Sequence, residues 1–88
     1  MNRAKTIYTD AYIELVMLLG DERKRLGLSQ LEVAEKLNMA QSDISKIETL
    51  ERRLDVLEFK KLLSIYRVDE NKKLRSCIMK FLNLDEHD

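Results

Sequence analysis

Proline and tryptophan are absent from this 88-residue sequence, and glycine occurs only twice. Without proline, no helix interior carries a built-in break. No alternating run of β-branched residues flanked by turn residues is present, so a β-sheet is not expected. With 44% apolar residues, the composition instead predicts an all-α protein of the size of one small domain.

Cysteine and histidine each occur once. The lone Cys77 excludes an internal disulfide and suits a reducing cytoplasm, and the lone His87 lacks the partners that metal binding or catalysis needs. The sequence also contains no paired carboxylates in a glycine-rich setting, no nucleophile with a base and no phosphate-cradling loop. We therefore expect no enzyme, with no catalytic residue, metal or cofactor.

Long apolar runs are missing too. The longest one, residues 12–19, is interrupted by Glu14 and is too short to cross a bilayer. The first residues lack the apolar core of a secretory signal. A cytoplasmic protein without a membrane partner is expected.

Neither sign of charge is in excess, since 16 Lys and Arg residues balance 16 Asp and Glu residues. The balance also holds locally, because residues 21–53 contain seven of each sign. Nucleic-acid binders are often basic, so neutrality predicts only weak non-specific binding to DNA. Affinity depends on where the charges lie, and neutrality favours a cooperative dimer over a tightly binding monomer.

Apolar periodicity and capping residues predict five helices, at about 10–26, 29–37, 41–48, 55–67 and 70–84. Their expected caps are Thr9 or Asp10, a left-handed Gly27, the capping boxes Ser29–Glu32 and Asp55–Glu58, and Asp69. The expected inner faces of the last two helices are Val56, Phe59, Leu62, Leu63 and Tyr66, then Leu74, Cys77, Ile78, Phe81 and Leu82.

The first helix carries apolar residues around much of its circumference. Either it is buried on two sides within the monomer, or one side packs against a partner subunit. Surplus apolar residues on the first and fifth helices predict a homodimer, with the fifth helix as the first choice of interface and the first helix as the second.

Residues 29–48 predict two short helices joined by a tight turn. Leu31, Ala34 and Leu37 repeat at helical spacing, and Ile44 and Ile47 resume it after a break at 38–40. Ala34 is small where the second helix must cross close to the first. The turn residue Asn38 tolerates a left-handed backbone better than most residues do.

The second of these helices offers a polar face that can read DNA. Its solvent-facing residues are expected to be Gln41, Ser42, Asp43, Ser45 and Lys46. Gln and Ser hydrogen-bond base edges, and Lys pairs with guanine or phosphate. This layout is typical of a DNA-binding helix-turn-helix.

At this point the sequence resembles a known family, the Cro and phage-repressor-like helix-turn-helix proteins, also called the XRE family. The resemblance covers about residues 19–69. Its marks are Arg23, Gly27-Leu28-Ser29-Gln30, Glu32-Val33-Ala34-Glu35-Lys36-Leu37, Gln41-Ser42-Asp43-Ile44-Ser45-Lys46-Ile47-Glu48 and Glu51-Arg52-Arg53-Leu54-Asp55. It implies a lambda-repressor-like bundle of about five helices, usually dimeric, whose third helix enters the major groove. We expect one domain, 1–88, with this core at 19–69 and a C-terminal helix at 70–84.

Two positions depart from the family pattern. Asn38 and Leu50 stand where the family usually has Gly. The change at Leu50 matters more, because a branched residue resists positive φ. Either the helix ends differently here, or Leu50 turns toward a hydrophobic neighbour.

The resemblance implies roles for several residues. Gln41 and Ser42 would read bases, although either could instead cap the helix. Gln30 would contact a phosphate, although a structural role is the alternative. Arg23 and Glu48 would form an ion pair that holds the reading helix at its angle.

The remaining candidates each keep two interpretations. Lys46 reaches a guanine or a phosphate, or is an ordinary solvated lysine. Asp43 accepts from a cytosine amine, or favours the helix N-terminus through the dipole; Ser45 touches phosphate or nothing. Arg52 and Arg53 contact phosphates, or one of them pairs with Asp55 or Glu51.

The expected function is a sequence-specific transcriptional regulator, most simply a repressor, bound as a homodimer to a two-fold operator in double-stranded DNA. One alternative is an antitoxin or another protein-interaction regulator, with a partner protein such as a toxin and DNA binding secondary. A restriction-modification controller protein is a close variant of the first reading.

Overall fold

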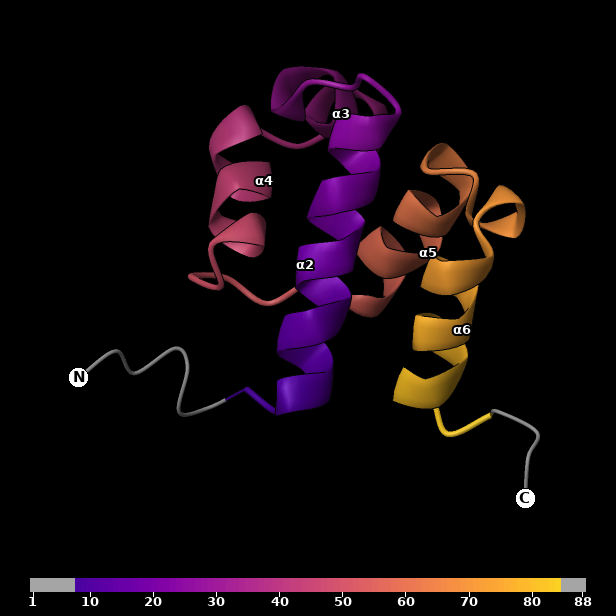
Figure 1. The fold of residues 1–88 in the computed structure, drawn as a ribbon. Coiled ribbons are helices and arrows are strands. Elements are labelled where there is room, and N and C mark those ends of the chain that lie inside the picture. The colour runs from indigo at the N-terminus through magenta and orange to yellow at the C-terminus, as the bar shows by residue number, and fades with distance from the viewer. Residues whose placement is uncertain (1–7, 85–88) are drawn as a thin grey trace.

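Helices account for the regular structure in residues 8–84, the part of the chain that the computed structural model describes (Figure 1). In order, they are α2 (Asp10–Arg25), α3 (Gln30–Leu37), α4 (Gln41–Glu48), α5 (Val56–Ile65), the 3-10 turn η1 (Val68–Glu70) and α6 (Lys72–Phe81). Five α-helices and no strand in this range confirm the expected all-α, lambda-repressor-like class.

The long helix α2 is the centre of the arrangement. Figure 1 shows α4 on one side of it, α6 on the other, and α3 across its C-terminal end. Helix α2 packs against both α4 and α6, while α3 packs against α4 and α5. The helix-turn-helix pair α3 and α4 is thus supported from behind by α2 and α5.

The starts of α2, α3 and α5 have the predicted capping residues. Thr9 Oγ1 accepts a hydrogen bond from the backbone N–H of Tyr12 at 3.1 Å. Ser29 and Glu32 satisfy each other's backbone N–H groups, at 3.0 and 2.7 Å. Asp55 and Glu58 do the same at the start of α5, at 2.8 and 3.0 Å. Each box satisfies two N–H groups that the helix itself cannot bond.

The first two helices of the sequence end in left-handed residues, as predicted. Gly27 has φ 74° and Asn38 has φ 58°. Gly27 adopts the positive φ without steric cost because it has no Cβ, and at Asn38 the short polar side chain tolerates it. These two ends set the directions in which the chain enters α3 and α4.

Leu50 also adopts the left-handed conformation, with φ 67°. The N–H groups of Leu50 and Glu51 donate to the carbonyls of Ile47 at 3.1 Å and Lys46 at 2.8 Å, the pattern of a Schellman ending. Helix α4 therefore ends in the ordinary way, and the alternative of a different ending is wrong. A side chain with Cβ at this φ costs about 1–2 kcal/mol.

The core lies where α2, α3, α4, α5 and α6 meet. Its most buried members are Val33 and Ala34 at 0% exposure and Tyr66 at 1%. Ala34 is small where α3 and α4 cross, as expected. The rest of the buried apolar set is Leu15, Val16, Leu19, Leu37, Ile44, Ile47, Leu62, Val68, Leu74 and Ile78.

Four expectations about burial and caps are wrong. Leu31 and Val56 are 54% and 81% exposed, because each stands in the first turn of its helix and faces away from the core, and Leu82 is 45% exposed just after α6. Asp69 lies inside η1, and Asn71 caps α6 instead by accepting from the N–H of Leu74 at 3.1 Å. The 3-10 turn moves the start of α6 by about half a helical turn.

The strain at Leu50 gives a stability prediction. Leu50→Ala keeps the Cβ at positive φ, whereas Leu50→Gly removes it, and both lose the same outer side chain. We expect the glycine variant to be more stable than the alanine variant by about 1 kcal/mol in urea unfolding. At Met17, exposed within α2, the same pair should differ by a similar amount in the opposite sense. Equal stabilities at Leu50 would contradict a strained left-handed leucine.

Candidate nucleic-acid interface

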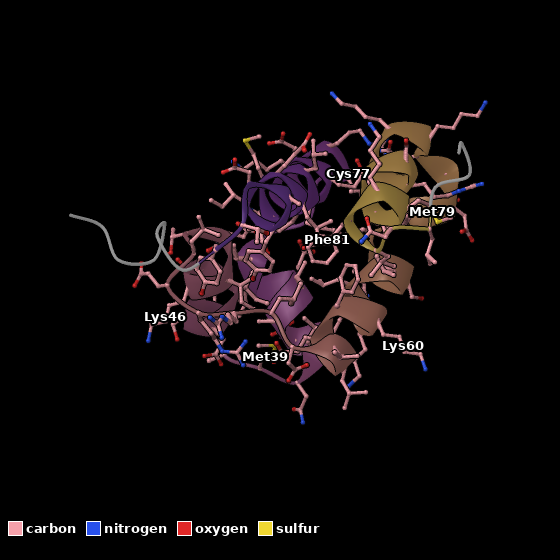
Figure 2. The ribbon with its side chains drawn as sticks, turned by 90° about the horizontal axis from the view of Figure 1, so that it is seen from below. Met39, Lys46, Lys60, Cys77, Met79 and Phe81 are labelled. Carbon is pink, nitrogen blue, oxygen red and sulfur yellow. The ribbon has the colours of Figure 1, made fainter. Side chains whose placement is uncertain are left out.

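Helix α4 turns one polar face to solvent because two isoleucines fix its rotation. Ile44 and Ile47 are 3% and 4% exposed, so the opposite face is open. Of the predicted contact residues on this helix, the exposed ones are Gln41, Ser42 and Lys46, and the half-buried ones are Asp43 and Ser45. Figure 2 shows Lys46 extending away from the body of the molecule.

Arg23 and Glu48 form a two-point ion pair between α2 and the end of α4. Arg23 Nε donates to Glu48 Oε2 at 2.7 Å and Nη2 donates to Oε1 at 3.0 Å. The side chains are only 10% and 17% exposed. Burial acts to raise the pKa of Glu48, but hydrogen bonds from Arg23 and Gln30 outweigh it, so the pKa lies below its ordinary value. The carboxylate therefore stays charged near neutral pH.

Gln30 extends this ion pair to Gln41. Gln30 Nε2 donates to Glu48 Oε1 at 3.0 Å, and Gln41 Nε2 donates to Gln30 Oε1 at 2.8 Å. Because a carboxylate only accepts, the amide nitrogen of Gln30 faces Glu48 and its carbonyl faces Gln41. The chain of contacts therefore orients the Gln41 amide, whose Oε1 has no partner among residues 8–84.

The start of α4 has no side-chain cap. The N-cap residue is Ala40, which carries no acceptor, so the alternative that Gln41 or Ser42 caps the helix is wrong. The Asp43 carboxylate accepts from the N–H of Ala40 at 3.3 Å, which fits an acid that stabilises a helix N-terminus. In the described chain the Ser45 hydroxyl has no hydrogen-bond partner, and its backbone carbonyl accepts from the Thr49 hydroxyl at 3.0 Å.

The two arginines after α4 have different partners. Arg52 donates from Nη1 and Nη2 to the two carboxylate oxygens of Glu58, both at 2.8 Å; the partners expected for such a pair were Asp55 or Glu51. The Arg53 guanidinium carbon lies 5.5 Å from the centre of the Tyr8 ring. Arg53 is exposed and makes no ion pair with another residue in 8–84.

Sequence reasoning missed three contacts at this surface, namely Gln30–Glu48, Arg52–Glu58 and Tyr8–Arg53. A capping-box acid retains acceptor capacity, so Glu58 could have been considered as a partner for Arg52. No local signal in the sequence pairs Gln30 with Glu48 or Tyr8 with Arg53, because the fold alone brings them together.

This surface carries the amides of Gln30 and Gln41, the hydroxyl of Ser42 and the cations of Lys46 and Arg53. These groups can bind base edges and phosphates. Within residues 8–84, no three His, Cys, Asp or Glu side chains are grouped so that they could hold a metal ion. No helix in that range is both long and apolar enough to cross a membrane.

The Glu48 carboxylate predicts how stability depends on pH. Its folded pKa is below the ordinary 4.5, so its stabilising contribution is complete above 4.5 and is lost as pH falls through the lower folded value. We expect Glu48→Gln to lower the free energy of unfolding near neutral pH by about 3 kcal/mol, because Arg23 loses its partner. The variant should also lose less stability than the parent as the pH falls below 4.5.

Urea unfolding at a series of pH values checks this expectation. The exposed Glu35 on α3 supplies the control, and Glu35→Gln should leave the free energy of unfolding near neutral pH nearly unchanged. An identical decline toward low pH in Glu48→Gln and the parent would show that Glu48 does not contribute to it.

Comparison with known proteins supports the arrangement described above. A search of curated proteins found no significant match. Residues 19–72, more than half of the chain, match the family model described as Helix-turn-helix. This match includes α3, α4, the loop after α4 and α5. The chain belongs to the Cro/C1-type helix-turn-helix, or XRE, family of DNA-binding transcription regulators.

Proposed function

We propose that this protein is a sequence-specific repressor that binds a two-fold operator in double-stranded DNA as a homodimer. The observation that carries the proposal is the chain of hydrogen bonds from Arg23 through Glu48 and Gln30 to Gln41. It holds an oriented amide at the exposed start of α4, where a helix entering the major groove meets base edges. Repression then follows from occupancy, because bound protein excludes polymerase from the same DNA.

Gln41 has the donors and acceptors that recognise adenine. Its Oε1 can accept from the adenine N6 amine, and the Nε2 hydrogen not bonded to Gln30 can donate to N7. Such a two-point contact discriminates against other bases by about 1–3 kcal/mol. Ser42 stands beside it, and Lys46 lies one turn further along the same face, within reach of a guanine or a phosphate.

Phosphate contacts would hold the helix in register. Arg53 and Lys46 are exposed cations, and Gln30 keeps one amide hydrogen beyond its bond to Glu48. Arg52 is different, because Glu58 already occupies two of its nitrogens. We assign Arg52 mainly to bracing the loop against α5, and Arg53 to the DNA backbone.

An apolar face on α5 and α6 supports dimerisation. A groove there is lined by residues that include Leu54, Phe59, Leu63 and Phe81. Val56 and Leu82 also line this groove and are 81% and 45% exposed, and Leu57, Met79 and Leu84 are further exposed apolar side chains on or just after α5 and α6. Figure 2 shows Met79 on the outer side of α6, whereas Phe81 lies toward α2. A second copy of the chain would cover this face.

Helix α2 is less suited to that role. Leu15, Val16 and Leu19 are buried inside the monomer, and Met17 is the one large apolar side chain of α2 that is strongly exposed. We therefore place the dimer contact on the α5–α6 face, which includes the fifth helix of the chain. The recognition helices would then meet half-sites about 10 base pairs apart.

The same apolar face favours a second candidate function. A different protein, such as a toxin, could occupy it, and DNA binding would then be secondary. The homodimer and partner-protein proposals differ in what they predict for the purified protein at high concentration. In the first a second copy covers the groove, and in the second the groove stays exposed. A homodimer leaves no such surface free.

Base reading by Gln41 is tested with operator duplexes selected from a random library by the purified protein. Gln41→Ala should weaken binding to the selected duplex by about 1–3 kcal/mol and leave binding to a scrambled duplex nearly unchanged, because base contacts specify. Gln30→Ala should cause a smaller loss of affinity for the selected duplex, because the Gln41 amide is then no longer held by Gln30. Titrations by fluorescence anisotropy, with folding checked by circular dichroism, measure both effects.

Leu31→Ala is a control for these titrations, because Leu31 is exposed on α3 outside the chain of contacts. It should retain full affinity. Equal losses on both duplexes for Gln41→Ala would mean that another helix reads the bases.

Dimerisation is tested by sedimentation at about 1–100 μM protein. The parent should sediment as a dimer, and Leu82→Glu should shift it to the monomer by placing a charge in the apolar contact. Met17→Glu is the matched control, since Met17 and Leu82 are both exposed, at 59% and 45%. It should leave the dimer intact. A parent protein that stays monomeric at the highest concentration would favour the partner-protein reading.

A further inference from the structure

Two tyrosines at the N-terminal end of α2 lie against the loop that follows α4. The Tyr8 and Tyr12 rings stack, with centroids 4.8 Å apart and planes inclined by 25°. The Arg53 guanidinium lies over the Tyr8 ring at 5.5 Å. Arg53 is far from both tyrosines in the sequence, and none of the family marks in residues 19–69 includes the tyrosines.

Tyr12 also holds the backbone of the same loop. Its hydroxyl oxygen accepts a hydrogen bond from the N–H of Leu54 at 3.1 Å. The ring in turn packs beside Phe81 of α6, with centroids 6.4 Å apart. Leu54, the residue after Arg53, is therefore fixed to α2 by a hydrogen bond between residues that are 42 positions apart in the sequence.

An arginine that packs against an aromatic ring can still bind a phosphate, whereas an arginine paired with a carboxylate is already neutralised. Glu58 neutralises Arg52 and uses two of its nitrogens. A ring face attracts the guanidinium through its quadrupole, while the N–H groups around the guanidinium edge can still bond a phosphate. Arg53 thus keeps its charge and its donors while its position is restricted.

We propose that Tyr8 and Tyr12 are positioning residues that hold Arg53 and its loop ready for a DNA phosphate before DNA binds. The proposal rests on the proposed DNA-binding function and adds two residues outside the helix-turn-helix. Its physical basis is pre-organisation, since a long side chain and a loop that are already restricted lose less conformational entropy on binding.

The test is a double-mutant cycle in DNA binding with the full chain. Tyr8→Ala should weaken binding to the selected and scrambled duplexes alike, by about 2- to 5-fold, because the lost contact is to the backbone. In the Arg53→Ala background, Tyr8→Ala should cause no further loss. Tyr8→Phe keeps the ring and should bind as the parent does.

Lys46 supplies the matched control for the cycle. It is an exposed cation on α4 that does not contact Tyr8, so the losses from Lys46→Ala and Tyr8→Ala should multiply. Arg53→Ala alone should reduce the slope of log affinity against log salt by about 1.

The Tyr12 contact has a readout that does not depend on DNA. Tyr12→Phe removes the hydroxyl and retains the ring, so the amide hydrogen of Leu54 should exchange with solvent faster than in the parent. The variant should also bind both duplexes more weakly.

Several results would overturn the proposal. A Tyr8→Ala loss that is the same with and without Arg53, or no loss at all, would remove the positioning role of Tyr8. Unchanged exchange at Leu54 in Tyr12→Phe would remove that of Tyr12. If Arg53→Ala binds like the parent while Gln41→Ala still loses discrimination, the positioning idea fails and the proposed function stands. If the parent selects no duplex, the proposed function fails and the proposal fails with it.

Discussion

The ion pair between Arg23 and Glu48 is the contact on which the recognition surface depends. Arg23 binds the Glu48 carboxylate at two points and also donates to the carbonyl of Leu28 at 2.9 Å. One side chain thereby fixes the end of α4, the chain between α2 and α3, and, through Gln30, the orientation of Gln41. A buried ion pair is weak support for net stability, because desolvation offsets much of its attraction. Its effect is on orientation, which is what the proposed base contact of the Gln41 amide requires.

Glu22, the residue before Arg23, connects α2 to α6 on the other side of the molecule. Glu22 is 3% exposed and accepts from Asn71 at 2.7 Å and from Arg25 at 2.8 and 2.6 Å. Asn71 in turn caps α6. Two adjacent residues of α2 thus position α4, which would read DNA, and α6, which would join the dimer. The central helix sets the relative placement of both surfaces.

Charge neutrality has a physical explanation in the way the acids are used. On the proposed DNA-binding side, four carboxylates bond within the protein: Glu32 and Asp43 to backbone N–H groups at helix starts, and Glu48 and Glu58 to arginines. The cations of Lys46 and Arg53 have no carboxylate partner in residues 8–84. Although the net charge of the chain is zero, these two cations are therefore available to bind phosphates. Two copies of the chain would double the phosphate contacts, which suits binding as a dimer.

The helices could be predicted from the sequence, because the signals that start and end them are local. Caps such as Ser29 with Glu32, and turn residues such as Gly27 and Asn38, act within a few residues of themselves. Other features depend on contacts between helices and could not be predicted in this way. Because the turn η1 precedes α6, Asn71 caps that helix instead of Asp69. Leu50 adopts a left-handed backbone where the chain turns from α4 toward α5. The family pattern suggested that Arg23 pairs with Glu48, but the fold alone brought Gln30 into that pair and Tyr8 to Arg53. Such contacts join residues distant in the chain, so their energies depend on packing that no local pattern records.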